Sequence, residues 1–287
     1  MPAVEQLLAV FACVWGAVWG SFLNVVIHRL PRGESLLTPP SHCPHCNARI
    51  RWYQNVPIVS YVLLGGKCAS CKAPISVRYP LVELTAACLS LAAWFTAAYN
   101  PLVPDLPTAL ALYAFLFLFV MALVAITFID LEFLIIPDSI SLPAIPIAVT
   151  FAALQGHFLG SSLVSGLIGA AAGAGLVALV IGLYYLATKQ IGMGWGDAKL
   201  MAMVGAFLGW RSLFFIFLAG SLQGLVYAGI MLMATRGKPG PAPGEEEAPE
   251  SLRKVKIPFG PFLAIGALEW LFFAPFIESR FSDWFGM

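Results

Sequence analysis

Apolar residues dominate this chain in eight long runs, which short polar or glycine-rich stretches separate. A helix needs about 20 mostly apolar residues to cross a bilayer, so these runs predict membrane-spanning helices. The fourth run is short, and the sixth is either a half-span or the first part of the seventh. We therefore expect an all-α polytopic membrane protein with about eight transmembrane helices. The expected segments are 6–27, 81–99, 108–129, 139–155, 161–187, 198–209, 212–234 and 258–277.

The composition agrees with this pattern. Of 287 residues, 60% are hydrophobic and only 11% are charged, and the mean hydropathy is +0.85. Soluble domains carry about 25% charged residues, so the composition excludes a single soluble core. The net charge of +1 favours no class of partner by itself.

The distribution of basic residues predicts the orientation. With the amino terminus outside, eight spans leave four inner connections, at 28–80, 130–138, 188–197 and 235–257. Fourteen of the sixteen Lys and Arg residues fall in or beside these connections. Cytoplasmic loops are enriched in Lys and Arg, so we expect these connections in the cytoplasm and both termini in the periplasm. The first run lacks a basic flank and a clear cleavage site, so it is expected to be a retained helix.

The same pattern predicts the domain organisation. A first transmembrane helix should occupy residues 1–27, and a small cytoplasmic domain residues 28–80. Seven further helices should form a second unit over 81–277, followed by a carboxy-terminal tail at 278–287. Within the second unit, residues 237–250 (GKPGPAPGEEEAPE) are rich in Pro, Gly and Glu, which is typical of a flexible cytoplasmic linker.

Four cysteines in the small domain are spaced like metal ligands. The chain contains Cys43-Pro-His-Cys46 and Cys68-Ala-Ser-Cys71, with 21 residues between the two pairs. Two such CxxC pairs predict a tetrahedral four-thiolate zinc site of structural type, because a closed shell leaves no position open for chemistry. Two disulfides are the alternative, but the cytoplasm is reducing. His42 and His45 are alternative ligands.

Three aspartates lie at the predicted membrane edge. Asp138 follows Pro137 at the start of a span and suits a helix cap, and Asp197 suits one too. Asp130 is harder to explain, because it ends the third run, where the helix dipole disfavours a negative charge. Ionisable groups at such positions are functional candidates. Asp130 and Asp197 both fall on the expected inner face.

Two facing aspartates can share a proton and activate a water molecule against a peptide carbonyl. The stretch before Asp197 reads GMGWGD. Gly194 and Gly196 would let a strand-like substrate approach the backbone closely. We therefore expect Asp130 and Asp197 to be catalytic, with Gly194 and Gly196 in support.

Several motifs together resemble the type IV prepilin peptidases, also called type II secretion leader peptidases. The resemblance runs from about residue 16 to 275. Asp138 matches an LPD-type motif of the family, so the resemblance implies a supporting role for it in the active site. Glu132 departs from the family pattern, since many members carry a second Asp there. The motifs, in order, are GSFLNVVIHRLP, CPHC, GGKCASC, RYPLVEL, TFIDLEFLIIPD, GMGWGDAKL and IPFGPFLA.

The resemblance implies an intramembrane aspartic endopeptidase of the GxGD type in the bacterial inner membrane, with Asp130 and Asp197 as its catalytic residues. Such enzymes cut the basic leader from prepilins and pseudopilins after a Gly, at the cytoplasmic face. Bifunctional members also methylate the new amino terminus with S-adenosylmethionine, an activity linked to the cysteine domain. Precursor pilins and membrane lipid are the implied partners, and nucleic acid is not.

Three alternatives remain at this point. Intramembrane acids and short spans are also typical of transporters and ion-coupled carriers. The chain could otherwise be a methyltransferase that no longer cuts, or a structural membrane scaffold. No G-x-G-x-x-G fingerprint follows a predicted strand, so the sequence places no site for the methyl donor.

Overall fold

The apolar runs form the helices that the sequence predicts. The computed structural model describes residues 2–155, 162–190, 192–235 and 257–285. Each of the eight expected segments is a helix, with bounds that differ by a few residues. These helices are α1 (Pro2–Arg29), α3 (Arg78–Ala98), α4 (Leu106–Phe133), α5 (Asp138–Gln155), α6 (Leu163–Thr188), α7 (Trp195–Leu208), α8 (Trp210–Thr235) and α9 (Gly260–Phe285).

Six of the described helices are long and apolar enough to cross a membrane, namely α1, α3, α4, α6, α8 and α9. Helix α7 has only 14 residues, so its length of about 21 Å is less than the roughly 30 Å hydrocarbon core. It is a separate helix, because Gly209 adopts a φ of +79° and ends it before α8 begins. Of the alternatives for the sixth segment, the structure therefore favours the half-span.

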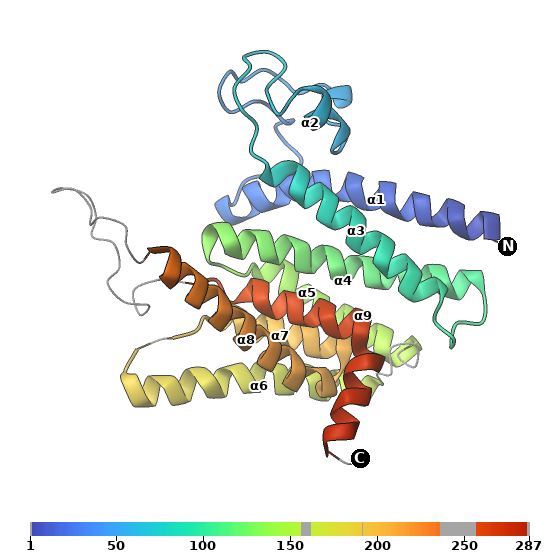
Figure 1. The fold of residues 1–287 in the computed structure, drawn as a ribbon, viewed down its shortest axis with the longest axis vertical. Helices are drawn as coiled ribbons and strands as arrows, with labels where there is room; N and C mark the ends of the chain where they lie inside the picture. Colours follow the sequence, from blue (N-terminus) through green and yellow to red (C-terminus); the bar gives the residue numbers. More distant parts are fainter. Residues whose placement is uncertain (1, 156–161, 191, 236–256, 286–287) are drawn as a thin grey trace.

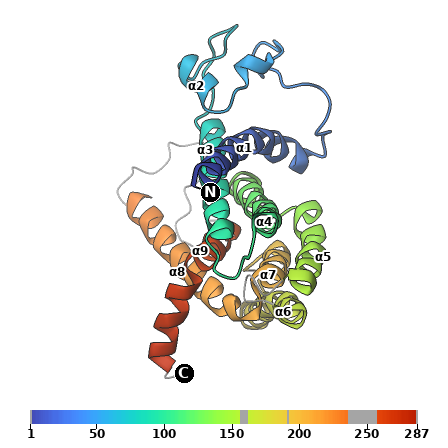
Figure 2. The same cartoon turned by 90° about the vertical axis from the view of Figure 1, so that its right-hand side faces the viewer.

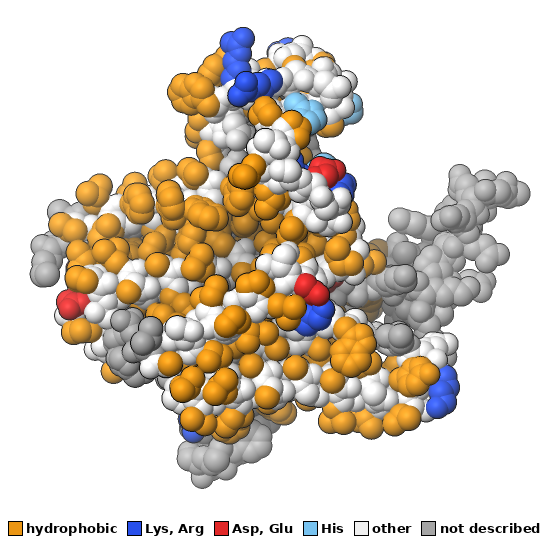
Figure 3. All heavy atoms as spheres, turned by 180° about the vertical axis from the view of Figure 1, so that it is seen from behind, with side chains coloured by type: hydrophobic (Ala, Val, Ile, Leu, Met, Phe, Trp, Pro, Cys, Tyr) orange, Lys and Arg blue, Asp and Glu red, His pale blue; other side chains and the backbone are white. Residues whose placement is uncertain are grey.

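The outer surface of the bundle is apolar. In Figure 3, hydrophobic side chains cover most of the visible helical face, whereas Lys, Arg and His side chains gather mainly on the small domain. On α8, Leu218, Leu222 and Leu225 are 52–69% exposed. A contiguous exposed apolar surface of this kind suits contact with lipid. The fold is that of a multi-pass membrane protein.

Helix α4 forms the centre of the bundle. It contacts α1 and α3 on one side and α5 and α9 on the other. The ring of Phe207 on α7 stacks on Phe115 and Phe119, with ring centroids 4.6 and 4.3 Å apart. Helix α4 is the most buried of the candidate spans, with 72% of its apolar window inside the protein. Groups near its end are therefore held rigidly.

Helices α6 and α7 pack backbone against backbone. A Cβ atom added at Gly169 would overlap the carbonyl oxygen of Gly205, and one added at Gly205 would overlap that of Gly169. Such close approach at small residues is typical of membrane helix pairs. The contact fixes the position of α7 and therefore of its first turn.

The small domain lies on the edge of the bundle formed by α1 and α3, away from α6 (Figures 1 and 2). It comprises the short elements η1 (Leu30–Arg32), η2 (Trp52–Gln54) and α2 (Val59–Leu63), joined by turns. Helix α1 continues to Arg29 and α3 begins at Arg78, so the ends of the predicted 28–80 domain belong to helices.

Two further boundaries can be compared with the prediction. The predicted linker at 237–250 lies outside the described residues. Residues 278–285, expected to form a tail, continue helix α9. The end of α4 and the starts of α7 and α9 lie at one end of the bundle, on the left in Figure 1.

Candidate active site and metal centre

Asp130 occupies the last turn of α4, where its charge opposes the helix dipole. The amino terminus of a second helix, α9, compensates for the unfavourable dipole of α4. The backbone N–H of Gly260, the first residue of α9, donates a hydrogen bond of 3.0 Å to Asp130 Oδ2. The residue is 5% exposed. Asp130 is therefore buried, and it faces the amino terminus of α9, which favours a negative charge.

Asp197 occupies the first turn of α7 and is 7% exposed. Gly194, not Asp197, is the N-cap residue, so the cap expected from the sequence is displaced by three positions. The N–H of Gly194 donates to Asp197 Oδ2 at 3.2 Å. Such a backward hydrogen bond is half of a capping box. Asp197 is thus also held by a glycine N–H at a helix start.

The two carboxylates lie close enough to interact electrostatically. Ile136, which follows α4, marks the place where their elements meet. A Cβ atom added at Gly196 would lie 3.0 Å from Cβ of Ile136, and one added at Gly260 would lie 3.2 Å from its Cδ1. Two buried carboxylates therefore lie at one end of the bundle, and the starts of two helices, α7 and α9, converge on them.

The predicted supporting residues contribute in different ways. Gly196 permits the close approach to Ile136, whereas a Cβ atom at Gly194 would make only ordinary contacts. Gly194 contributes its N–H instead. Asp138 begins α5 and forms a 2.6 Å ion pair with Lys199 on α7. This pair joins the two short helices beside the carboxylates.

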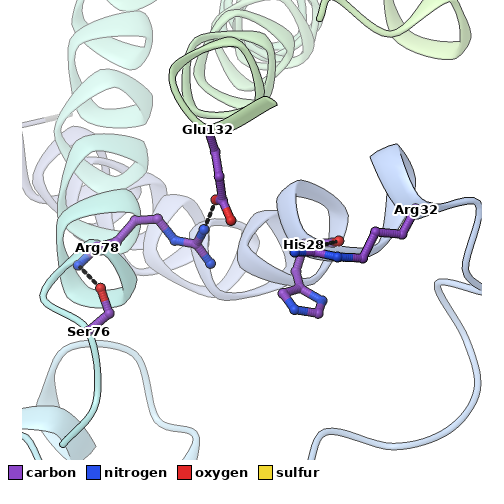
Figure 4. A network of polar contacts seen from close by, with 5 residues as sticks. All are labelled: His28, Arg32, Ser76, Arg78 and Glu132. Atoms are coloured by element: carbon purple, nitrogen blue, oxygen red, sulfur yellow. Dashed lines mark hydrogen bonds and ion pairs between the residues drawn. The ribbon is translucent and has the colours of Figure 1, made fainter. Parts of the chain in front are cut away.

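Glu132 takes part in a polar network at the end of α4. It forms an ion pair with Arg78, the first residue of α3 (Figure 4). His28 and Arg32 lie nearby, and the Arg32 guanidinium donates to the His28 carbonyl oxygen. The pair connects the base of the small domain to the helix that carries Asp130.

The four predicted cysteines gather in the small domain. Their sulfur atoms all lie within 4.8 Å of one another, and the closest pairs, Cys43–Cys71 and Cys46–Cys68, are 3.8 and 4.0 Å apart. A disulfide needs about 2.05 Å, so these are free thiols. Sulfurs at the corners of a zinc tetrahedron with 2.3 Å bonds are about 3.8 Å apart, which this cluster matches.

Each CxxC pair lies in a turn, here called a knuckle, and the turn that holds Cys68 stabilises negative charge on its sulfur. The N–H of Cys43 donates to Ala48, and that of Cys68 donates to Ala73 in the same way. Backbone N–H groups of Cys71 and Ser70 lower the pKa of the Cys68 thiol to about 6. Burial and the neighbouring cysteines raise the pKa of the Cys71 thiol to about 11, so one thiolate forms readily and a cation is needed to stabilise a second. A thiolate is the form that binds metal. The cluster could therefore hold a metal ion, and its donor set suits zinc.

A cavity of about 1040 Å³ separates the small domain from the helices. Its walls come from the small domain, the end of α1, the start of α3 and the end of α4. Glu83, on α3, lines it and is only 8% exposed. Its Oε2 accepts a 2.7 Å hydrogen bond from the N–H of Ile58 in the small domain.

The sequence names Glu83 only as a possible partner of the basic leader, and it gives no role to Gly260. Gly260 lies in the motif IPFGPFLA and Glu83 in RYPLVEL. Both motifs contribute to the family resemblance, but the sequence alone assigns no function to either motif as a whole. Gly260 acts through its backbone N–H, and it lies 130 residues from Asp130 along the chain. A backbone contact between residues so far apart leaves no pattern of side chains in the sequence. A buried acid in an apolar helix could have marked Glu83, but its cavity depends on the tertiary fold.

Comparisons with known families cover both parts of the chain. Residues 14–97 match the Bacterial Peptidase A24 N-terminal domain, and residues 116–229 match the Type IV leader peptidase family. The first match spans the small domain and the second spans both aspartates.

Individual relatives are similar over most of the chain. A "Prepilin leader peptidase/N-methyltransferase" of Aeromonas hydrophila is 39% identical, covering 88% of this chain and 87% of the relative. Proteins of the same name from Pseudomonas aeruginosa and Myxococcus xanthus are 36% and 33% identical. These alignments cover 94% and 95% of this chain, and 95% and 92% of the two relatives. No solved structure gives a significant match.

Proposed function

The chain belongs to the type IV leader peptidase family, and we propose that it is an inner-membrane prepilin leader peptidase that also methylates the new amino terminus. Its substrates are prepilins or pseudopilins, cut after the Gly that precedes their apolar helix. The transporter alternative has no specific support, since each relative reported above bears the peptidase/N-methyltransferase name.

One observation carries the assignment of the peptidase site to Asp130 and Asp197. Two buried carboxylates interact at one end of the bundle, each held by a glycine N–H at the start of a helix. Neighbouring carboxylates in a buried site retain one proton between them, because a like charge opposes the second ionisation. One acid and one base are thus available together.

The arrangement suits hydrolysis of a peptide bond. The ionised carboxylate takes a proton from a water molecule as its oxygen attacks the peptide carbonyl carbon. The protonated carboxyl donates its proton to the carbonyl oxygen, which yields a tetrahedral gem-diol. When that intermediate collapses, the C–N bond breaks, and the departing amine nitrogen takes a proton from the pair. Because the proton belongs to the pair, neither aspartate is assigned a fixed state.

The location of the site suits the substrate class. A precursor pilin can place its apolar helix among the spans while its basic leader stays in water. The bond to be cut then lies at the depth of the end of α4. We place this end of the bundle, the small domain and the predicted linker in the cytoplasm, and both termini in the periplasm. The distribution of Lys and Arg supports this orientation.

We assign zinc to the four-cysteine cluster as a structural ion. Cys43, Cys46, Cys68 and Cys71 would hold it, and the sulfur spacing supports four-thiolate ligation. The ion would connect two knuckles that bury little apolar surface of their own. S-adenosylmethionine, implied by the N-methyltransferase name of the relatives, would supply the methyl group.

Substitution of each aspartate by asparagine tests the peptidase site. Asp130→Asn and Asp197→Asn remove an acid–base group with little change in shape, so leader removal should fall by at least about 10²–10⁴-fold. Purified protein is incubated with a prepilin, and the loss of the leader is followed by gel and mass spectrometry.

The matched control is Asp105→Asn. Asp105 is the exposed N-cap of α4, at the helix end opposite Asp130, where its carboxylate accepts the Thr108 N–H. Because Asn caps a helix as well as Asp does, this variant should cut normally. Full cleavage by either Asp130→Asn or Asp197→Asn would remove that residue from the mechanism.

A further inference from the structure

We propose that the cavity between the small domain and α1, α3 and α4 binds the sulfonium methyl donor, and that the Glu83 carboxylate faces the donor's positive charge. The inference rests on the proposed methyltransferase function. The cavity measures about 1040 Å³, at the upper end of the roughly 300–1,000 Å³ of ligand pockets. It can accept a donor of nucleoside size together with the end of a peptide.

Glu83 gives the cavity its electrostatic preference. Its carboxylate is buried, and no cation forms an ion pair with it among the described residues. An uncompensated buried charge is costly, so a cationic ligand would be stabilised there. One oxygen already accepts the Ile58 N–H. The Ser21 hydroxyl, which also lines the cavity, hydrogen-bonds the carboxylate as well. Both of these donors are neutral, so the negative charge of Glu83 is left for a sulfonium or ammonium group in the cavity.

Two further polar atoms of the cavity wall lack partners. Oδ1 of Asn24 and Nε of Arg78 are buried without a hydrogen bond among the described residues, and both residues line the cavity. Buried polar groups usually have a partner, so these two indicate a ligand. One is an acceptor and the other a donor. Together they match the ammonium and the carboxylate of an amino-acid group such as S-adenosylmethionine carries.

The cavity lies against the same helix end as the peptidase site. Phe128, Leu131 and Glu132 line it from the last turns of α4, whereas Asp130, on the same turns, faces Gly260. The two sites are therefore separated by about one helix diameter, roughly 10–12 Å. The Arg78–Glu132 ion pair lies between α3 and α4 at this point (Figure 4). The new amino terminus of a cleaved pilin would therefore reach the cavity by passing around the end of α4.

The chemistry balances with groups already named. The neutral amine nitrogen attacks the methyl carbon, and an N–C bond forms as the S–C bond breaks. The electron pair of the broken bond stays on sulfur, which becomes a neutral thioether. The surplus proton of the amine leaves to solvent. The positive charge next to Glu83 disappears in this step, so the cavity should hold the product less tightly than the donor.

The decisive experiment compares two ligands on the full-length protein. Isothermal titration calorimetry measures the affinity of wild type and Glu83→Gln for S-adenosylmethionine and for S-adenosylhomocysteine, its uncharged thioether product. Gln keeps an acceptor for the Ile58 N–H but removes the charge. Glu83→Gln should weaken S-adenosylmethionine binding about tenfold or more and leave S-adenosylhomocysteine binding nearly unchanged. Glu278→Gln, at an exposed acid near the far end of α9, is the matched control and should change neither affinity.

A second variant tests the cavity by volume. Val25 on α1 lines the cavity and is half-buried, so Val25→Phe should reduce the affinity for both ligands. In both variants, methylation of a cleaved pilin should fall with donor binding, while leader removal stays within about threefold of wild type, since α4 separates the two sites. Leader removal also reports that each variant is folded.

Failure of the proposed methyltransferase function and failure of the proposed donor site would give different results. If wild type cuts a prepilin but neither binds the donor nor methylates the product, the proposed methyltransferase function is wrong, and this inference falls with it. If wild type binds and methylates while Glu83→Gln and Val25→Phe do the same, the donor binds elsewhere. If the variants keep donor binding but raise the KM for prepilin, the cavity holds the leader peptide instead.

Discussion

At the scale of single residues, the placement of Asp130 illustrates what a sequence can and cannot report. Its position at the end of an apolar run marks it as functional, because the local dipole opposes a carboxylate there. The contact that compensates, from the N–H of Gly260, involves no side chain and spans 130 positions. The sequence therefore predicts the acids but not the groups that hold them.

Gly260→Ala should impair cleavage through this contact. A Cβ atom there would lie 2.8 Å from Asp130 Oδ2, closer than such atoms pack. The carboxylate must shift, and we expect the rate of leader removal to fall about 10²-fold, as small misplacements in catalytic sites do. The measurement is single-turnover cleavage, with the melting temperature as a check on folding.

Gly229→Ala serves as the comparison, because a Cβ atom on that α8 glycine would meet nothing within 4 Å. It should cut at the wild-type rate. Normal cleavage by Gly260→Ala would show that the hydrogen bond to Asp130 is dispensable.

At the scale of elements, the helices could be predicted because apolar length is a strong signal. The cysteine knuckles could be predicted because ligand spacing is fixed by metal geometry. The break at Gly209 could not, since a single glycine between α7 and α8 fits both a bend and a continuous helix. The position of the small domain depends on contacts such as Glu83–Ile58, which carry no local pattern.

Removal of a knuckle sulfur should unfold the small domain and leave the bundle intact. Purified wild-type protein should contain about one zinc per chain, and Cys43→Ser should lose most of it, because three thiolates cannot complete the tetrahedron. Metal analysis and limited proteolysis between residues 30 and 77 measure the two effects. Cys88→Ser, at an exposed cysteine outside the cluster, is the control and should retain the metal.

A Cys43→Ser variant that keeps a full zinc content and resists protease would contradict the four-thiolate assignment. Loss of the aspartate-dependent cleavage at the same time would show that the small domain also supports the bundle.

At the scale of the whole molecule, the distribution of Lys and Arg and the arrangement of the helices both support our assignment of one end of the bundle to the cytoplasm. The small domain's attachment, the end of α4 and the starts of α7 and α9 all lie there (Figure 1). An epitope tag inserted after Gln190, between α6 and α7, should therefore be accessible only in permeabilised spheroplasts. A tag after Leu102, between α3 and α4, should be accessible in intact ones.

Both tagged proteins must still remove leaders for the comparison to count. The reverse pattern of accessibility, or exposure of both tags on one side, would overturn the proposed orientation.

The glycine N–H groups that hold both aspartates have a consequence for drug resistance. A bacterium usually escapes an inhibitor by changing side chains around the bound molecule. Here the groups that orient the acids belong to the main chain, and at position 260 any larger residue presses on an acid itself. A compound designed against this pair of carboxylates would therefore meet a target with few viable escape substitutions.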